Sequence, residues 1–104
     1  MLVQAMPYSR RRMKDQVGRS ADSFVLNIAE GSGEFTKREK ARFYRIARRS
    51  VCETAGALRL AVRYRIFPSA RIEPAMRLLD ETAAMLTTMC NNLTRQANAT
   101  KKAR

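Results

Sequence analysis

The sequence contains no histidine and no tryptophan, and it has only four glycines, three prolines and two cysteines among 104 residues. So few glycines and prolines exclude a linker protein and a turn-dense β fold. The two cysteines, Cys52 and Cys90, do not make a disulfide framework, and without clustered Cys and His ligands we expect no zinc site. No run approaches 18 consecutive apolar residues, which argues against a membrane span. The apolar N-terminus is too short for a signal-peptide core, so we expect a cytoplasmic protein.

The lack of histidine also bears on catalysis, because acid–base chemistry would fall to carboxylates, Lys, Tyr or Cys. Nine acidic residues are scattered among 21 Lys and Arg, and such neighbours keep carboxylates ionised. Cys52 has Arg49 nearby but no accompanying base, and Cys90 lies on an apolar face as a packed thiol would. We therefore expect no enzymatic activity, no cofactor and no metal.

What the sequence does contain is positive charge and enough apolar residues to fold. The formal net charge is +12, which indicates a polyanionic partner. Hydrophobic residues make up 45% of the chain, so its composition is not that of a disordered protein. A chain of this length is one small domain with a marginal core, and oligomerisation would bury more of its surface.

Three stretches have the hydrophobic periodicity of amphipathic helices, which predicts an all-α antiparallel helical bundle. The first spans about residues 9–30, with Gly31 expected in the left-handed conformation that ends many helices. The second begins at a Thr36–Glu39 capping box and is predicted to reach residues 66–67, because Pro68 disfavours helix before it.

The third helix is predicted to begin at Ser69 as N-cap, or slightly later, with Pro74 in its first turn, and to end near Asn98. The sequence thus divides into an N-terminal remnant (residues 1–8), a helical bundle domain (residues 9–98) and a frayed basic tail (residues 99–104).

The second helix carries two opposite faces. Its small inward residues allow a neighbouring helix to approach closely, and its buried hydroxyls can bond back to the preceding turn. The predicted inward face is Phe43, Ile46, Ala47, Ser50, Thr54, Ala57, Leu58 and Ala61. The opposite face holds an arginine stripe, namely Arg38, Arg42, Arg45, Arg49, Arg59 and Arg63. Arginines stacked at helical spacing can follow a phosphate backbone, so we favour nucleic-acid contact over the alternative of a merely solvated face.

A second basic cluster, Arg10, Arg11 and Arg12, lies at the entry to the first helix, where positive charge opposes the helix dipole. An external anion or a partner subunit would relieve this conflict, and a frayed, solvated start is an equal alternative. Four aromatic residues are candidates for stacking on bases beside the basic groups. They are Tyr8, Phe43, Tyr44 and Tyr64, of which Phe43 fits the core better and the last two also fit an interface.

The first helix also carries a polar row beside its apolar stripe, made of Ser20, Ser23, Asn27 and Glu30. We favour local satisfaction of these polar groups over a ligand site. Glu30 falls in the last turn, where the dipole disfavours an anion, so it needs compensation from an arginine of the second helix or from another chain.

The run from Asp22 to Gly33, DSFVLNIAEGSG, resembles the four-helix-bundle family of 23S rRNA intervening-sequence proteins. The similarity covers most of residues 9–95 and is most specific over the Asn-Ile-Ala-Glu-Gly-Ser-Gly segment. The residues that match the family motif are Ser23, Asn27, Ile28, Ala29, Glu30 and Gly31. The accessory variability protein of diversity-generating retroelements is similar in fold.

The resemblance implies a helical bundle, a homopentamer and no known enzymatic activity, with the motif serving a structural role. It also implies that the family's first helix is absent here or reduced to Met1–Met6. Its loss would expose apolar surface, so either another chain covers that surface or the assigned start is late.

Together these observations predict a non-enzymatic basic bundle that binds nucleic acid through its arginine-rich faces, as a homo-oligomer. The resemblance alone favours RNA over DNA. The alternative is an accessory subunit whose partner is a protein, such as a reverse transcriptase of a diversity-generating retroelement. A membrane-surface helix is disfavoured, because the polar faces carry Glu and the apolar faces suit bundle packing.

Overall fold

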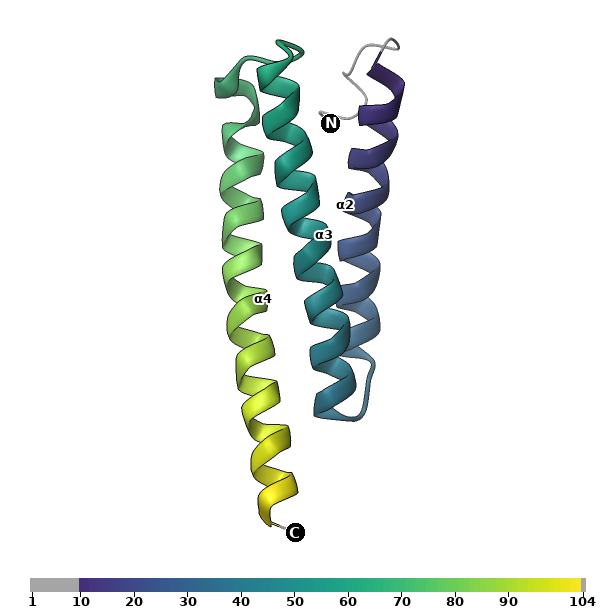
Figure 1. The fold of residues 1–104 in the computed structure, drawn as a ribbon, viewed down its shortest axis with the longest axis vertical. Helices are drawn as coiled ribbons and strands as arrows, with labels where there is room; N and C mark the ends of the chain where they lie inside the picture. Colours follow the sequence, from purple (N-terminus) through teal and green to yellow (C-terminus); the bar gives the residue numbers. More distant parts are fainter. Residues whose placement is uncertain (1–9, 104) are drawn as a thin grey trace.

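The structure, a computed structural model, describes residues 10–103, and the regular structure in that range is entirely helical (Figure 1). Helix α2 spans Arg11–Ser32, α3 spans Lys37–Arg63 and α4 spans Ser69–Ala103. Successive helices run in opposite directions through short connections, which confirms the predicted all-α antiparallel arrangement. The predicted remnant at residues 1–8 lies outside the described residues, as do residues 9 and 104.

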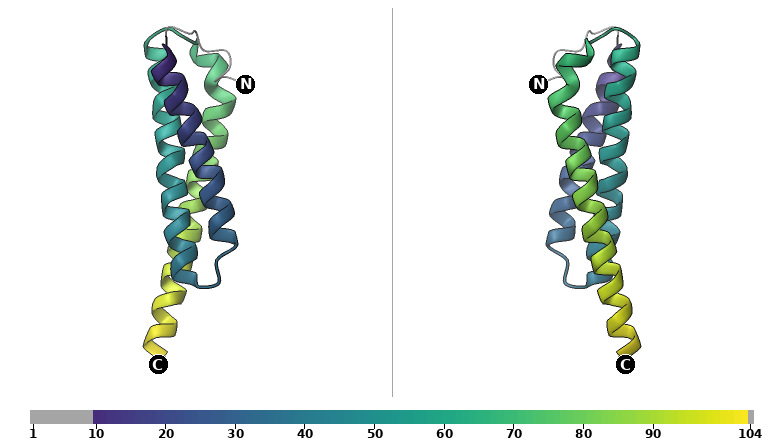
Figure 2. Two further views of the ribbon diagram at one scale, coloured as in Figure 1. Left: turned by 90° about the vertical axis from the view of Figure 1, so that its right-hand side faces the viewer. Right: turned by 90° about the vertical axis from the view of Figure 1, so that its left-hand side faces the viewer.

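Helix α3 is the centre of the molecule. Both α2 and α4 pack along it, whereas α2 and α4 scarcely contact each other (Figures 1 and 2). The resulting body measures 57 × 20 × 16 Å, with a radius of gyration of 16.3 Å. A compact domain of about 100 residues has a radius near 13 Å, so the three helices form an elongated, open assembly.

The end of α2 differs from the prediction. Gly31 is a buried residue inside the helix, and the helix is capped by Gly33 at φ −87°, with no left-handed glycine in the described part of the chain. The reason is packing: a Cβ atom on Gly31 would lie 2.6 Å from Cε1 of Tyr44. Gly31 is therefore required by the close approach of α3 and not by a turn.

The start of α3 confirms the predicted cap, because the Thr36 side chain accepts a hydrogen bond from the Glu39 N–H at 3.2 Å. Its end comes earlier than predicted, at Arg63 instead of residues 66–67. Arg65 takes a left-handed φ of 58°, and the N–H groups of Arg65 and Ile66 bond back to carbonyls of the last turn at 2.9 Å. This pattern is a Schellman motif, so a turn closes the helix before proline can.

Helix α4 begins with Ser69 as its first helical residue, which places Pro74 in the second turn and not in the first. The helix also continues through residues 99–103, where a frayed tail was predicted. Lys101 and Lys102 favour its last turn by facing the negative end of the helix dipole. The basic tail is therefore an extension of the helix beyond the α2–α3 turn (Figure 1).

The core is shallow because α3 uses small side chains on the surfaces it buries. Most of the predicted inward face is buried, but Phe43 and Ile46 are only half-buried, and Tyr44, Val51 and Ala55 take interior positions instead. The face shifts because α3 has a neighbour on each flank and buries a wider arc than one stripe. Among the described residues, Val51 is the largest side chain that is fully buried.

Several large apolar side chains stay exposed on the flanking helices. Val25 of α2 is 59% exposed, and Leu78 and Met85 of α4 are 65% and 63% exposed. Leu78 and Met85 are seven residues apart and so share a face of α4. Within residues 10–103, apolar surface is thus left uncovered on α4.

Candidate nucleic-acid interface

The predicted arginine stripe occupies the side of α3 that faces away from its neighbours. The structure brings in one further member, Arg48, which lies at the margin of the same face and was passed over because it does not fit the four-three-four spacing. All seven side chains are exposed: Arg38, Arg42, Arg45, Arg48, Arg49, Arg59 and Arg63. Their charge is therefore available to solvent along the length of the helix.

Only one member of the stripe has a carboxylate partner within residues 10–103. The Arg42 Nε donates to Glu39 Oε2 at 3.0 Å, and its guanidinium lies 4.4 Å from the centre of the Phe43 ring. Arg45 and Arg49 make no ion pair in the described part of the chain. These two residues are the best-placed cations for an external anion, since binding breaks no internal contact.

The stripe is interrupted between Arg49 and Arg59, where the outer face carries Cys52, Glu53 and Gly56. Ten residues of helix correspond to a gap of about 15 Å. We call the two parts the lower arginine cluster (Arg38, Arg42, Arg45, Arg48 and Arg49) and the upper arginine cluster (Arg59 and Arg63).

The N-terminal arginines lie against the end of α3 that carries the upper cluster. Arg10, Arg11 and Arg12 are exposed, and they line a hollow together with Ala57 and Leu60 of α3. The structure therefore joins two basic segments that lie about fifty positions apart in the sequence, and it extends the positive surface across the α2–α3 contact.

The aromatic candidates divide between surface and core. Tyr64 is 50% exposed, with the Arg10 guanidinium 5.0 Å from its ring centre. Tyr44 is buried beside Gly31, so it offers no stacking surface, and Phe43 is half-buried. Tyr8 lies outside the described residues. Among the three candidates within residues 10–103, Tyr64 is the most exposed, and the half-buried Phe43 also lies beside an arginine, Arg42.

The polar row of α2 faces α3 and forms a ladder of hydroxyl groups. Ser20 Oγ and Thr54 Oγ1 are 2.8 Å apart, and Ser23 Oγ and Ser50 Oγ are also 2.8 Å apart. Asn27 completes it by donating to the Ser23 carbonyl at 2.8 Å. Every buried side-chain N and O atom of residues 10–103 has a hydrogen-bond partner. Satisfaction of polar groups therefore explains this row, and its hydrogen bonds run between α2 and α3 as well as within α2.

Glu30, the last member of the row, is exposed. Within residues 10–103 it forms no ion pair, so of the two expected partners an arginine of α3 is not present, and another chain stays a prediction.

The cysteines differ in environment. Cys90 is buried and donates weakly to the Ala41 carbonyl at 3.8 Å, and burial raises the pKa of its thiol against the opposing influence of Arg45 and Arg48. Cys52 is exposed. No group of three metal-ligating side chains is found in residues 10–103, and none of the described helices is long and apolar enough to cross a membrane.

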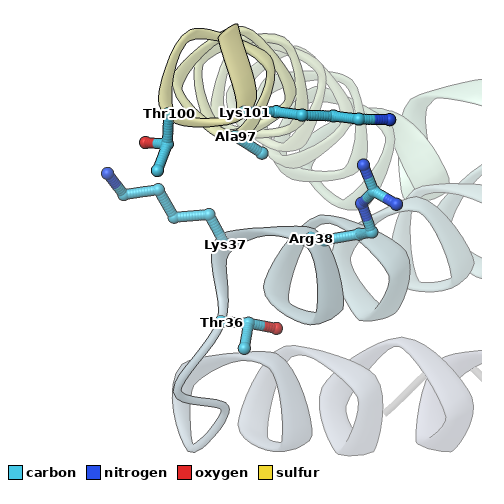
Figure 3. Close-up of a pocket in the computed structure, with 6 residues that line it drawn as sticks. All are labelled: Thr36, Lys37, Arg38, Ala97, Thr100 and Lys101. Carbon is cyan, nitrogen blue, oxygen red and sulfur yellow. The ribbon is translucent and has the colours of Figure 1, made fainter. Parts of the chain in front are cut away.

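A basic hollow that the sequence analysis missed lies where the start of α3 meets the end of α4 (Figure 3). It has a volume of about 420 Å³ and is lined by Thr36, Lys37, Arg38, Ala97, Thr100 and Lys101. About sixty positions of sequence separate the two sides of the hollow, and hydrophobic periodicity alone does not predict that such distant segments lie side by side. The available signal was compositional, because no acidic residue follows Glu81 in the chain.

A sequence model of the family described as "23S rRNA-intervening sequence protein" matches residues 2–88. The chain belongs to this family. Comparison with curated proteins and with solved structures gave no significant match. The relation to the retroelement accessory protein stays a prediction. The basic hollow draws half of its lining from the part of α4 beyond the matched residues.

Part of the predicted family motif lies at the α2–α3 contact. Ser23 and Asn27 belong to the hydroxyl ladder, and Ile28 packs against the core. Gly31 lies against the Tyr44 ring, and its carbonyl accepts from Lys40 Nζ at 3.2 Å. Ala29 and Glu30 are exposed, so the packing within this chain does not explain them.

Proposed function

We propose that this protein binds nucleic acid, with RNA favoured, through the lower and upper arginine clusters and has no enzymatic activity. The observation that carries the proposal is the exposed row of arginines on the outer face of α3, most of it without internal partners among the described residues. The description of the family names 23S rRNA, which favours RNA over DNA.

The physical basis of this binding is contact with phosphates. A helix places successive arginines about 5.4 Å apart along its axis, and each guanidinium can hold a phosphate with two hydrogen bonds. Nothing in the chain resembles a base-reading motif, so recognition rests on charge and shape. Arg10, Arg11 and Arg12 extend the same surface beside the upper cluster.

Assembly into a homo-oligomer belongs to the same proposal, because several copies multiply the positive surface and cover exposed apolar side chains such as Leu78 and Met85. The five-copy assembly, the cytoplasmic location and the reverse-transcriptase partner remain predictions, and none of these three has support in the contacts described above.

The first test is a double substitution, Arg45→Gln with Arg49→Gln, compared with the unaltered protein on a structured RNA, a matched DNA duplex and heparin. Loss of two phosphate contacts should weaken RNA binding several-fold and lower the slope of log K against log salt by about 1.5. The slope is the decisive measurement, because any protein of charge +12 binds polyanions at low salt.

Arg19→Gln with Arg71→Gln is the matched control, since it removes the same charge from exposed sites on α2 and α4 that, like Arg45 and Arg49, form no ion pair within residues 10–103. Equal slopes for the two double variants would mean that the charge acts generically and would overturn the assignment to α3. Binding to all three polyanions that collapses together near physiological salt would contradict a dedicated nucleic-acid role.

A further inference from the structure

The basic hollow at the end of the molecule holds three cations from two helices. Figure 3 shows Arg38 and Lys101 extending to one side of it, and Lys37 pointing toward Thr100 on the other. Its six lining residues include no acidic side chain, and Lys37, Arg38 and Lys101 form no ion pair within residues 10–103. Bringing like charges together costs free energy that a bound anion would recover.

The charge and shape of the hollow favour a phosphate monoester. A monoester carries close to two negative charges at neutral pH, whereas each phosphate within a strand carries one. Three cations therefore match a terminal phosphate better than an internal one. Thr36 lines the same hollow, and its hydroxyl, which accepts from the Glu39 N–H, keeps its own proton to donate to a further phosphate oxygen.

An exposed aromatic residue is adjacent in sequence to the residues that line this hollow. Phe35 immediately precedes Thr36, and its side chain is 99% exposed, the highest value among the large apolar residues of the described chain. An aromatic ring left in water makes no contribution to the core, but it offers a face on which a base can stack. A terminal nucleotide presents a base and a phosphate together, so one ligand accounts for both features.

We propose that the basic hollow binds the terminal phosphate of a nucleic-acid strand, with the terminal base stacked on Phe35. This inference rests on the proposed function and adds to it a preference for phosphorylated ends. The partial positive charge at the N-terminus of α3 assists, but the three cations that α3 and α4 place around the hollow carry the assignment.

The test compares one single-stranded RNA with a 5′-phosphate, a 3′-phosphate or hydroxyl groups at both ends. The unaltered protein should bind at least one phosphorylated form roughly tenfold more tightly than the unphosphorylated form. Lys37→Gln with Lys101→Gln should abolish this preference while leaving binding to the unphosphorylated RNA nearly unchanged. Phe35→Ala should reduce the affinity for the phosphorylated form, and free nucleoside monophosphate should compete only at much higher concentration.

Arg95→Gln with Lys102→Gln is the control, because it removes two cations from α4 that line a separate hollow. It should keep the preference, as should Arg45→Gln with Arg49→Gln, which lowers affinity for every RNA form. Equal affinity for all RNA ends overturns the terminal-phosphate site and leaves the proposed function standing. If free nucleoside monophosphate bound as tightly as the phosphorylated RNA, the hollow would be a nucleotide site and not a site for strand ends. Absence of RNA binding would overturn both proposals.

Discussion

At the scale of single residues, α2 contains two interior glycines with opposite roles. A Cβ atom on Gly31 would meet Tyr44 Cδ1 at 2.9 Å and Phe43 Cβ at 3.2 Å, in addition to the Cε1 contact. A Cβ atom on Gly18 would meet nothing within 4 Å. The same residue type therefore maintains a close helix contact at one position and only lowers helix propensity at the other.

Replacing each glycine with alanine should change stability in opposite directions. Gly31→Ala should lower the free energy of unfolding by about 1–3 kcal/mol, because the buried Tyr44 ring must move. Gly18→Ala should raise it by about 0.5–1 kcal/mol, the usual gain of alanine over glycine in a helix. Urea denaturation of both variants checks this, and a stable Gly31→Ala protein would show that α3 can shift away at little cost.

Residue-level patterns predicted some of these roles and missed others. Thr36 was predicted as an N-cap because the capping box is a local signal that involves only four residues. Gly31 was assigned to a turn, because the ring that presses on it belongs to a different helix. Phe35 was passed over, because an aromatic residue between two helices has no periodic pattern that would indicate its exposure.

At the scale of helices, the hydroxyl ladder fixes how α2 lies on α3. Ser20 and Ser23 of α2 pair with Thr54 and Ser50 of α3 in antiparallel order. The hydroxyls are also satisfied along their own helices, since Thr54 Oγ1 lies 2.8 Å from the Ser50 carbonyl oxygen. The contact therefore carries no unpaired group, and its small side chains let the two helices approach closely.

A double-mutant cycle on Ser20→Ala and Thr54→Val should reveal their direct interaction. Each single change should lower the free energy of unfolding by about 1 kcal/mol, because a buried hydroxyl loses a partner. The double variant should lose less than the sum, with a coupling of roughly 0.5–1 kcal/mol. Chemical denaturation gives all four values, and strict additivity would mean that the two hydroxyls act only along their own helices.

The helices themselves and the start of α3 followed from the sequence, whereas other helix ends and the exact faces did not. Apolar periodicity indicated all three, and the lower arginine cluster apart from Arg48 followed from its spacing. The end of α3 was missed because Arg65 takes a left-handed conformation that no common sequence signal announces. The continuation of α4 past Asn98 was missed because its last turns bury little, so hydrophobic pattern carries no information there.

At the scale of the whole molecule, three helices leave one side open. α2 and α4 both rest on α3 and scarcely contact each other, so their remaining faces lack a neighbour within residues 10–103. Most of the arginine clusters lie on the other side of α3, and only Arg38 and Arg59 among them line hollows shared with α4. A second copy can therefore cover apolar surface without covering the surface proposed for nucleic acid.

The assembly proposal predicts a solution mass that is a multiple of the 11.9 kDa chain. Leu78→Glu should shift this mass toward a single chain, because it places a charge in an apolar contact. Leu26→Glu is the control, since Leu26 is 63% exposed and Leu78 65%, but Leu26 has Asp22 and Glu30 one turn to either side. Light scattering after size-exclusion chromatography measures the masses, and a native mass of 11.9 kDa at micromolar concentration would contradict assembly.

The basic hollow belongs to the whole molecule as well, because its two sides come from chain segments sixty positions apart. The sequence contained each cation, but the lysines of residues 99–104 were interpreted as a solvated tail. Only the antiparallel path of α4 along α3 brings Lys101 to Lys37 and Arg38. The composition showed the positive charge, but only the fold shows that Lys37, Arg38 and Lys101 line one hollow.

The small side chains that α3 buries have a thermal consequence. Ala41, Ala47, Ala55, Ala57 and Ala61 are all buried, so a large part of the interior exposes little apolar surface on unfolding. The heat capacity of unfolding scales with that surface. A single chain should therefore have a smaller heat capacity change than most domains of its length and a correspondingly flat dependence of stability on temperature. Copies that associate through their open sides would bury additional apolar surface. This would increase the heat capacity change and make the free energy of unfolding depend more steeply on temperature.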